Sequence, residues 1–361
     1  MMKNKTEKKI KGISLFTGAG GMDVGFKKAG IDIVLANEIN DCAIKTYIAN
    51  NPTVKILKGD IDTFMQDFEQ YKDKIDIVFG GPPCQGFSVA GRMDPNDKRS
   101  KLIWSFLKVV EIVKPKLFIM ENVKALATLE KWSKIKEEFI KKATALGYFC
   151  DYIVLNAADY GVCQNRERVF FVAYKKNLHS SFYQNLYQLK NTSKNLREIL
   201  QELPKIGSKE HPNTCNAKIT LAAKPVLRKS PYAGMIFNGM GRPLNLNSVS
   251  QTLPASMGGN KTPIIDENLL KNRNATDWVS DYHQKILNKL IEPEYKEAPH
   301  FLRRITIKEA AKIQSFPDDY IFVGPKTSIY TQIGNAVPCK LAESVAIAAI
   351  KTLIESKSAK K

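Results

Sequence analysis

The sequence lacks the residue patterns of metal-binding and disulfide-rich proteins. Its six cysteines are scattered without a Cys-x-x-Cys pair, and its four histidines do not cluster with them. We therefore expect a reduced intracellular protein without a structural metal.

Long apolar segments are also absent. Residues 1–11 are charged and have no apolar core of a signal peptide, and no apolar run approaches the roughly 20 residues that span a bilayer. These absences speak against secretion and membrane insertion, so we expect a cytoplasmic protein with no membrane partner.

Acidic residues are the minority among the charges. The chain of 361 residues has 55 Lys and Arg against 36 Asp and Glu, a net charge of +19. The excess fits a polyanionic partner such as nucleic acid, although a lysine-rich composition alone gives the same sign. A hydrophobic content of 43% supports a large domain with a smaller second one.

One cysteine stands in an unusual setting. The apolar run 75–79 predicts a buried strand, and it leads into Gly80-Gly81-Pro82-Pro83-Cys84-Gln85-Gly86-Phe87-Ser88. The prolines stiffen the backbone before the thiol, and the glycines let a ligand approach closely. An isolated cysteine is commonly a small buried hydrophobe in a turn, so this stretch alone leaves its role open.

The start of the chain has the pattern of a nucleoside-binding unit. A strand is expected over 10–16, then the glycine-rich turn 17–21, then a helix over 22–29. The glycines let a ligand lie against the backbone at the helix N-terminus. A tight strand-to-helix connection has the same pattern, so the turn indicates no more than a nucleoside-like ligand.

Two acidic residues follow the next expected strands. Glu38 comes after strand 31–36, about twenty residues beyond the glycine turn, and Asp60 comes after the apolar run 54–57. Such carboxylates can accept hydrogen bonds from ribose hydroxyls and from an adenine amino group. Each acid alone is commonly a loop end or a helix cap, but together they favour adenosine binding.

Further along, an acid and two arginines stand at strand ends. Glu121 follows the expected strand 116–120, and Arg166 and Arg168 precede the apolar strand 169–173. Their spacing puts both guanidiniums on one face of a strand, where they can hold a carbonyl or a phosphate. A surface pair bonded to nearby acids is the alternative. The alternation of strands and helices up to residue 173 predicts a doubly wound α/β sheet.

Regularity fades from 174 to 299 and then returns. The irregular segment predicts a small domain of short strands and loops, with Asn260 and Lys261 in a glycine-rich loop. A helix is expected over 307–314, with Thr306 and Glu309 in capping-box spacing, and the stretch Tyr330 to Pro338 opens a last amphipathic helix that runs through about residue 354.

The ordered set of motifs resembles the cytosine-C5 DNA methyltransferase family, from Ile10 to about Ala349 apart from the irregular segment. In this resemblance Phe16 to Gly21 forms the S-adenosylmethionine loop, Glu38 binds ribose and Asp60 binds adenine. Ile39 departs from the aromatic residue of many relatives. The remaining motifs are Pro83-Cys84-Gln85 for the nucleophile, Glu121-Asn122-Val123 for the acid on the target base, Gln164 to Arg168, Arg303 to Asp318 and Gln332 to Val337.

The resemblance implies three groups of site residues. The catalytic residues are Cys84, Glu121, Arg166 and Arg168. The cofactor-binding residues are Phe16, Gly18, Gly20, Gly21, Glu38, Ile39, Asp60, Ile61, Pro83, Asn335 and Ala336. The expected DNA contacts are Gln85, Ser88, Arg99, Asn260 and Lys261, with 88–99 as a lid.

It also implies an architecture and partners. We expect a Rossmann-like methyltransferase sheet in residues 1–174, a smaller target-recognition domain in 175–300 and a return to the catalytic domain in 301–361. The cofactor is S-adenosylmethionine, which leaves as S-adenosylhomocysteine, and no metal takes part. The partner is double-stranded DNA in the bacterial nucleoid, bound by a monomer that acts alone or with a cognate restriction endonuclease.

The implied chemistry explains the residue types. The Cys84 thiolate adds to C6 of a flipped-out cytosine so that C5 can attack the methyl group. Glu121, with its pKa raised, protonates or hydrogen-bonds N3, and Arg168, supported by Arg166, holds O2.

Three alternatives remain at this point. The first is an enzyme of the same fold that acts on tRNA cytosine, against which the long recognition segment and the lack of a Cys-Phe-Thr tripeptide speak. The second is a catalytically inactive DNA-binding homologue, which the intact Cys84, Glu121 and Arg168 oppose. The third is a nicotinamide-dependent oxidoreductase, in which the Pro-Pro-Cys stretch and the paired arginines have no role.

Overall fold

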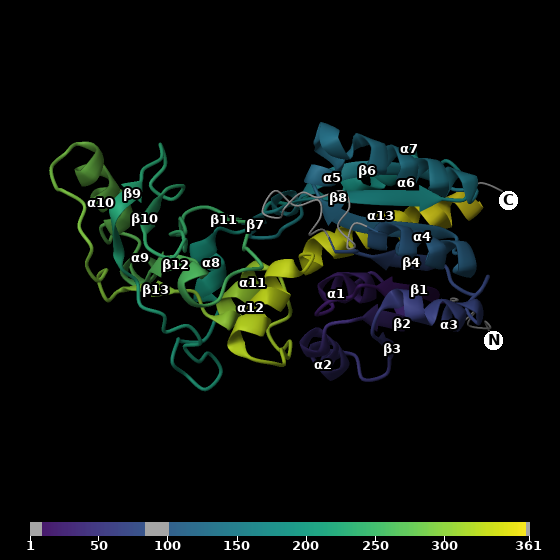
Figure 1. Cartoon of the computed structure of the whole chain (residues 1–361), viewed down its shortest axis with the longest axis horizontal. Coiled ribbons are helices and arrows are strands. Elements are labelled where there is room, and N and C mark those ends of the chain that lie inside the picture. The colour runs from purple at the N-terminus through teal and green to yellow at the C-terminus, as the bar shows by residue number, and fades with distance from the viewer. Residues whose placement is uncertain (1–8, 84–100, 359–361) are drawn as a thin grey trace, which may run out of the picture. The chain divides into compact units, whose positions relative to one another are not determined.

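The computed structural model describes residues 9–83 and 101–358, and these divide into two compact units (Figure 1). Unit 1 takes the described residues of Met1–Tyr160, Glu167–Asn191 and Val337–Lys361. Unit 2 takes Gly161–Arg166 and Thr192–Ala336. The two units are defined by their compactness. The expected division by function, with boundaries between residues 174 and 175 and between 300 and 301, stays a prediction.

Unit 1 is built on a seven-stranded sheet of order β3-β2-β1-β4-β5-β8-β6. All neighbours pair in parallel except β8, which runs antiparallel to both β5 and β6. Its strands are β1 (Ile10–Leu15), β2 (Ile31–Glu38), β3 (Lys55–Lys58), β4 (Ile77–Gly80), β5 (Leu117–Val123), β6 (Phe149–Asn156) and β8 (Glu167–Tyr174). The carboxyl ends of β1 to β5 therefore share one edge of the sheet.

Helices cover both faces of this sheet. Val78 belongs to the apolar core shared with α3, α4 and α6, whereas Phe79 stacks on Phe26 of α1 at 4.0 Å between ring centroids. Successive side chains of a strand point to opposite faces, so the two residues mark two layers. The helices are α1 (Gly21–Lys28), α2 (Asp41–Asn50), α3 (Met65–Glu69), α4 (Leu102–Val113), α5 (Ala125–Thr128), α6 (Ser133–Ala145), α7 (His179–Tyr187) and α13 (Cys339–Ser358), with short 3-10 turns η1 (Ile61–Phe64), η3 (Glu130–Trp132) and η4 (Ala157–Asp159).

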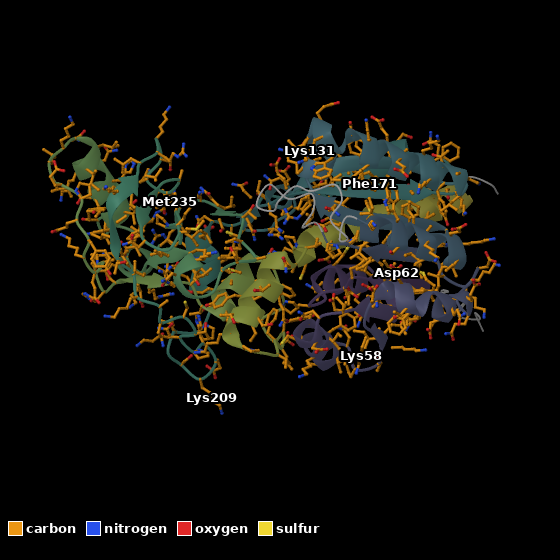
Figure 2. All side chains as sticks on the ribbon, in the orientation of Figure 1. Lys58, Asp62, Lys131, Phe171, Lys209 and Met235 are labelled. Atoms are coloured by element: carbon orange, nitrogen blue, oxygen red, sulfur yellow. The ribbon has the colours of Figure 1, made fainter. Side chains whose placement is uncertain are left out.

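Aromatic residues fill the core on the side of α4 and α6. Phe171 of β8 (Figure 2) meets Phe139 of α6 edge-on at 5.0 Å, and Phe139 in turn meets Phe118 of β5 at 6.2 Å. All three side chains are buried. Burying each large aromatic side chain contributes on the order of 2 kcal/mol, which fixes the sheet as a rigid platform for the strand ends.

Unit 2 has shorter elements around its own core. Its strands are β7 (Gln164–Asn165), β9 (Leu221–Val226), β10 (Met235–Phe237), β11 (Ser250–Gln251), β12 (Ile264–Asp266) and β13 (Leu302–Arg304). Its helices are α8 (Leu196–Gln201), α9 (Glu267–Lys271), α10 (Trp278–Leu287), α11 (Ile307–Ile313) and α12 (Lys326–Asn335), with the 3-10 turn η5 (Gly259–Lys261). Its apolar core joins β9, β10, β12, β13 and α10.

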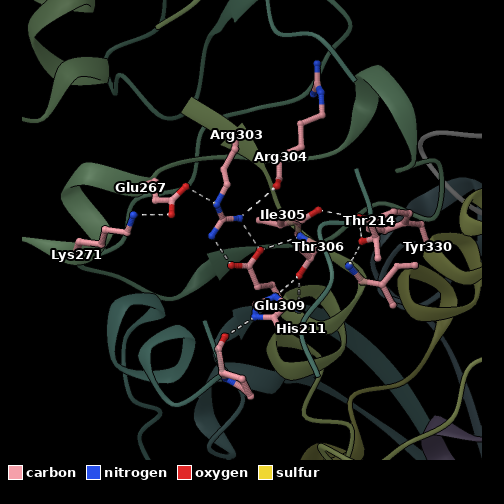
Figure 3. A network of polar contacts seen from close by, with 12 residues as sticks. His211, Thr214, Glu267, Lys271, Arg303, Arg304, Ile305, Thr306, Glu309 and Tyr330 are labelled. Carbon is pink, nitrogen blue, oxygen red and sulfur yellow. Dashed lines mark hydrogen bonds and ion pairs between the residues drawn. The ribbon is translucent and has the colours of Figure 1, made fainter. Parts of the chain in front are cut away.

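A buried ionic network ties β13 to α11 within unit 2 (Figure 3). Arg303 donates to both oxygens of Glu309, at 2.9 and 2.8 Å, and also to Glu267 at 3.2 Å. Glu309 completes a capping box by accepting from the Thr306 backbone N–H at 2.8 Å. Nε2 of His211 lies 2.8 Å from the side-chain hydroxyl of Thr306.

The predicted doubly wound α/β sheet is confirmed. So is the helix after Thr306, whose capping box has both of its hydrogen bonds. The helices α2 and α12 were not expected from the sequence, and neither were α7 to α10. Among the residues that the structure describes, no helix combines the length and apolarity needed to cross a bilayer.

Candidate active site

The segment that leads to Cys84 leaves the sheet in a tightly fixed conformation. Strand β4 is buried throughout, and a Cβ on Gly80 would lie only 2.1 Å from the backbone oxygen of Leu15. No side chain can therefore be placed at this point of the strand. The carbonyl of Pro82 accepts a hydrogen bond of 3.2 Å from the buried Asn122 amide at the end of β5. Cys84, Gln85, Ser88 and Arg99 lie outside the described residues.

Glu121 and Arg168 meet beside this segment. Strands β5 and β8 pair so that Val123 lies opposite Arg168, and Arg168 Nε reaches Glu121 Oε1 at 3.0 Å. Both side chains are largely buried, with 11% and 15% of their surface exposed. The other oxygen, Oε2, would lie 2.7 Å from a Cβ on Gly81. The structure therefore brings an acid, a guanidinium and the segment before Cys84 to one edge of the sheet.

The two arginines of the motif have different environments. Arg166 belongs to unit 2, where its buried guanidinium donates to the backbone oxygens of Leu253 at 3.3 Å and Gly334 at 2.8 Å. Arg168 belongs to unit 1 and pairs with Glu121. The strand is interrupted between them, because β7 ends at Asn165 and β8 begins at Glu167. Arg166 thus holds main chain within unit 2.

The glycine-rich turn between β1 and α1 has the backbone expected of a ligand cradle. Phe16 has a positive φ of 53°, which is unfavourable for a residue with a side chain, and Gly18 and Gly20 have φ of 55° and 82°. The N–H of Gly18 donates to Glu38 Oε2 at 2.7 Å. Gly21 opens α1 directly after this turn.

Glu38 is held by three backbone N–H groups. Besides Gly18, the N–H groups of Ile39 and Asn40 donate to its Oε1 at 2.9 and 2.8 Å. These bonds fix the carboxylate at the end of β2 and leave lone pairs that can accept from ligand hydroxyls. The arrangement suits the two hydroxyls of a ribose.

An exposed apolar side chain stands next to this carboxylate. Ile39 is 64% exposed, whereas Ile61, just past the next strand end, is buried. Between them Asp60 is exposed at the end of β3 and accepts from the Asp62 N–H at 3.0 Å. An apolar surface flanked by two carboxylates can bind a flat base with an attached sugar.

The remaining predicted residues that the structure describes belong to the segment before Cys84 and to unit 2. Pro83 is half-buried at the end of the described segment. Asn335 and Ala336 end α12 in unit 2, with Asn335 exposed and Ala336 half-buried. Asn260 and Lys261 are exposed in η5, also in unit 2.

Two supporting residues escaped the sequence analysis. Asn122, inside the Glu121 motif, holds Pro82 across 40 positions of sequence. Asp23 of α1 is buried behind the glycine turn and accepts from the Thr17 hydroxyl at 2.9 Å. An acid at the third position of an otherwise apolar helix start was the only available signal for Asp23.

Known proteins resemble the chain along nearly its whole length. The sequence profile of the C-5 cytosine-specific DNA methylases matches residues 10–351. The type II methyltransferase M1.HphI of Haemophilus parahaemolyticus is 33% identical, covering 94% of this chain and 86% of that protein. The type II methyltransferase M.FnuDI of Fusobacterium nucleatum is 32% identical, covering 98% and 97%.

A solved structure has the same fold. The Entamoeba histolytica methyltransferase EhMeth superposes with a TM-score of 0.68, covering 96% of this chain and 99% of that one at 18% identity. The sheet, the paired Glu121 and Arg168, and the match over residues 10–351 agree with one another. The chain therefore belongs to the C-5 cytosine-specific DNA methylase family.

Proposed function

We propose that this DNA (cytosine-5-)-methyltransferase transfers a methyl group from S-adenosylmethionine to a cytosine flipped out of duplex DNA, while Cys84 is bonded to C6. The enzyme class follows from the family. The observation that carries the finer proposal is the buried Glu121–Arg168 pair, 3.0 Å between Nε and Oε1, beside the segment that leads to Cys84.

The residues of unit 1 fit S-adenosylmethionine. The Glu38 carboxylate is fixed for a ribose, Ile39 offers an exposed apolar surface for adenine, and Asp60 is free to accept from its amino group. When bound, S-adenosylmethionine supplies a methyl group made electrophilic by its sulfonium. Phe16, Gly20, Gly21, Ile61 and Pro83 complete the proposed cofactor site within unit 1. Asn335 and Ala336, which the resemblance also assigns to cofactor binding, belong to unit 2.

The proposed catalytic side chains act on different atoms of the cytosine ring. The Cys84 thiolate adds to C6, and the displaced electron pair makes C5 nucleophilic. Glu121 stabilises the charge that develops at N3, by a hydrogen bond or a proton, and Arg168 holds O2. C5 then takes the methyl group, whose bond to sulfur breaks. Loss of the C5 proton to a base and departure of the thiolate restore the aromatic ring. The contribution of Arg166 is to hold the main chain of unit 2.

Access to C6 requires the target base to leave the helix. Rotating a base out of the stack costs about a few kcal/mol, which contacts to the DNA must offset. We propose Gln85, Ser88 and Arg99 for contacts near the flipped base, and Asn260 and Lys261 for contacts in the recognition segment 175–300. Their side-chain types suit base edges and phosphates.

The relatives support a more specific role. M1.HphI and M.FnuDI are type II methyltransferases, and we propose that this chain likewise methylates one short duplex sequence as a monomer, with a cognate endonuclease as its partner in the cell.

The direct test measures transfer of labelled methyl groups to duplex DNA and to tRNA. We expect incorporation into DNA at one sequence context, located by methylation-sensitive sequencing. Incorporation into tRNA alone would replace the proposed substrate with the first alternative.

Cys84→Ser is expected to abolish methyl transfer while leaving duplex binding intact, since a hydroxyl is a far weaker nucleophile than a thiolate. DNA carrying 5-fluorocytosine should trap the wild-type chain as a covalent adduct that peptide mass analysis places at Cys84. Cys150→Ser is the matched control, because burial raises the pKa of the Cys150 thiol and keeps it unreactive. Near-normal turnover of Cys84→Ser would remove Cys84 from the nucleophile role.

A further inference from the structure

We propose that Asp23 is a positioning residue for the methyl donor, acting through Thr17 and Tyr47 to hold the glycine-rich turn in the conformation that binds S-adenosylmethionine. This inference rests on the proposed function, because it concerns the same cofactor site. Asp23 accepts hydrogen bonds from Ser14, Thr17 and Tyr47, which are not among the predicted cofactor-binding residues, so its effect is transmitted by these partners.

Three elements donate to this one carboxylate. The Ser14 hydroxyl of β1 and the Thr17 hydroxyl of the turn both donate to Oδ2 at 2.9 Å. The Tyr47 hydroxyl of α2 donates to Oδ1 at 2.9 Å. A carboxylate has enough acceptor lone pairs for all three hydroxyl donors, and hydrogen bonds to it are stronger when it is ionised.

Burial makes a negative charge at this position energetically unfavourable. Asp23 is 1% exposed, and burial raises its pKa even though the hydrogen bonds from Thr17, Tyr47 and Ser14 lower it. Lys27, one helical turn along, adds a favourable electrostatic interaction without an ion pair. The three hydroxyl donors compensate for the loss of water around this carboxylate, and one of them, Thr17, belongs to the glycine-rich turn.

Thr17 is the structural anchor of this turn. The Thr17 backbone N–H donates to the backbone oxygen of Asn37 at 3.0 Å. The backbone oxygen of Thr17 accepts from the Gly20 N–H at 2.9 Å. Its neighbours Phe16 and Gly18 both have positive φ, and Gly18 donates to Glu38. A strained turn persists only where its surroundings hold it, and here the side chains that hold it are Glu38 through Gly18 and Asp23 through Thr17.

Tyr47 links Asp23 to the second strand-to-helix unit, formed by β2 and α2. Its ring is fully buried in α2, the helix that follows Glu38, Ile39 and Asn40. Asn51 donates to the Tyr47 backbone oxygen at 2.9 Å and accepts from Lys27 of α1. Asp23 therefore couples the turn, which would border the cofactor, to the helix behind the ribose-binding carboxylate.

The test measures cofactor affinity by calorimetry in the full chain without DNA. Asp23→Asn keeps the shape and removes the charge, and we expect it to weaken S-adenosylmethionine binding about tenfold, the effect of one charge-assisted hydrogen bond. S-adenosylhomocysteine, which lacks the sulfonium charge, should lose affinity by the same factor, because the effect lies in the geometry of the turn. The melting temperature of the free protein should stay within a few degrees of wild type.

Partner variants keep the inference testable if Asp23→Asn folds poorly. Thr17→Val removes only the hydroxyl and should weaken binding of both ligands, and in the double variant with Asp23→Asn the losses should not add. Glu69→Gln, an exposed acid at the end of α3, is the matched control and should bind like wild type.

Three results would overturn the inference while leaving the proposed function in place: unchanged affinity in Asp23→Asn, a loss confined to S-adenosylmethionine, or additive losses in the double variant. A loss confined to the charged ligand would assign Asp23 a purely electrostatic effect. Failure of the wild-type chain to bind S-adenosylmethionine would instead overturn the proposed cofactor, and this inference with it.

Discussion

Gly81 illustrates how single residues determine this site. It lies between the buried end of β4 and the prolines before Cys84, and an added Cβ would stand 2.7 Å from Glu121 Oε2. A real Cβ does not come so close to an oxygen, so a side chain there requires the carboxylate to move. With Arg168 on the opposite oxygen, Glu121 is confined from two sides.

Gly81→Ala is therefore expected to lower kcat by about tenfold or more, because a shift near 1 Å in a reacting group has effects of this size. Duplex affinity should change little. If the substitution acts through the carboxylate, Gly81→Ala combined with Glu121→Gln should be no slower than Glu121→Gln alone. Multiplying losses in the double variant would show that Gly81 acts by another route.

At this scale the sequence predicted the identities of residues better than their contacts. Glu121 and Arg168 were expected to work together from motif order, and the structure pairs them in unit 1. Strand spacing also placed Arg166 beside Arg168, but a break in the strand assigns its guanidinium to backbone oxygens of unit 2. The contacts of Asn122 with Pro82 and of Asp23 with Tyr47 depend on chain crossings that no local pattern encodes.

Among the elements, α11 owes its position to the Arg303 network. Arg303 grips both oxygens of Glu309, whose side chain is 2% exposed, and Glu309 also caps the helix. A buried pair of this kind is costly to break, because removal of one partner leaves the other charge without compensation.

Arg303→Met should consequently destabilise unit 2 by about 3–5 kcal/mol, measured as the free energy of unfolding in urea. Lys271→Met is the matched control, since the lysine is 66% exposed in its ion pair with Glu267 and should cost less than about 1 kcal/mol. Equal, small losses in both variants would mean that the network contributes little to stability.

A helix can be predicted from the sequence when the residues that stabilise it are close together in the chain. The helix α11 was predicted because its capping box is written in four consecutive positions, Thr306 to Glu309. The helix α2 carried the weaker signal of an Asn40 cap, with Ala43, Ile44 and Tyr47 buried. The helix α12 has polar residues on most of its surface and follows a proline, so its stability comes from tertiary packing that the sequence pattern does not reveal.

For the molecule as a whole, the net charge is the quantity that bears on binding to DNA. The net charge of +19 gives the protein a strong attraction for a polyanion, and such binding releases counterions. We expect duplex affinity, measured by fluorescence anisotropy, to fall by about tenfold or more between 50 and 200 mM salt. Duplexes with and without a methylation site should show similar slopes, and affinity independent of salt would rule out a dominant phosphate contribution.

Architecture at this scale was predicted where alternation is regular. The doubly wound sheet of unit 1 followed from strands and helices of ordinary length. Unit 2 uses strands of two to six residues, such as β10 and β11, whose pairing is set by the surrounding chain. Short strands of this kind leave no periodic pattern to detect, so only their presence was expected.

The packing of α13 against α1 has a consequence for how the protein is made. A Cβ on Gly25 would lie 2.4 Å from both the Cys339 oxygen and the Glu343 nitrogen, so the two helices touch through their backbones. On a ribosome adding about 5–20 residues per second, α1 waits on the order of half a minute for this partner. Unit 1 thus stays incomplete until residues beyond 338 emerge, and we expect a chain released before then to be bound by chaperones or degraded.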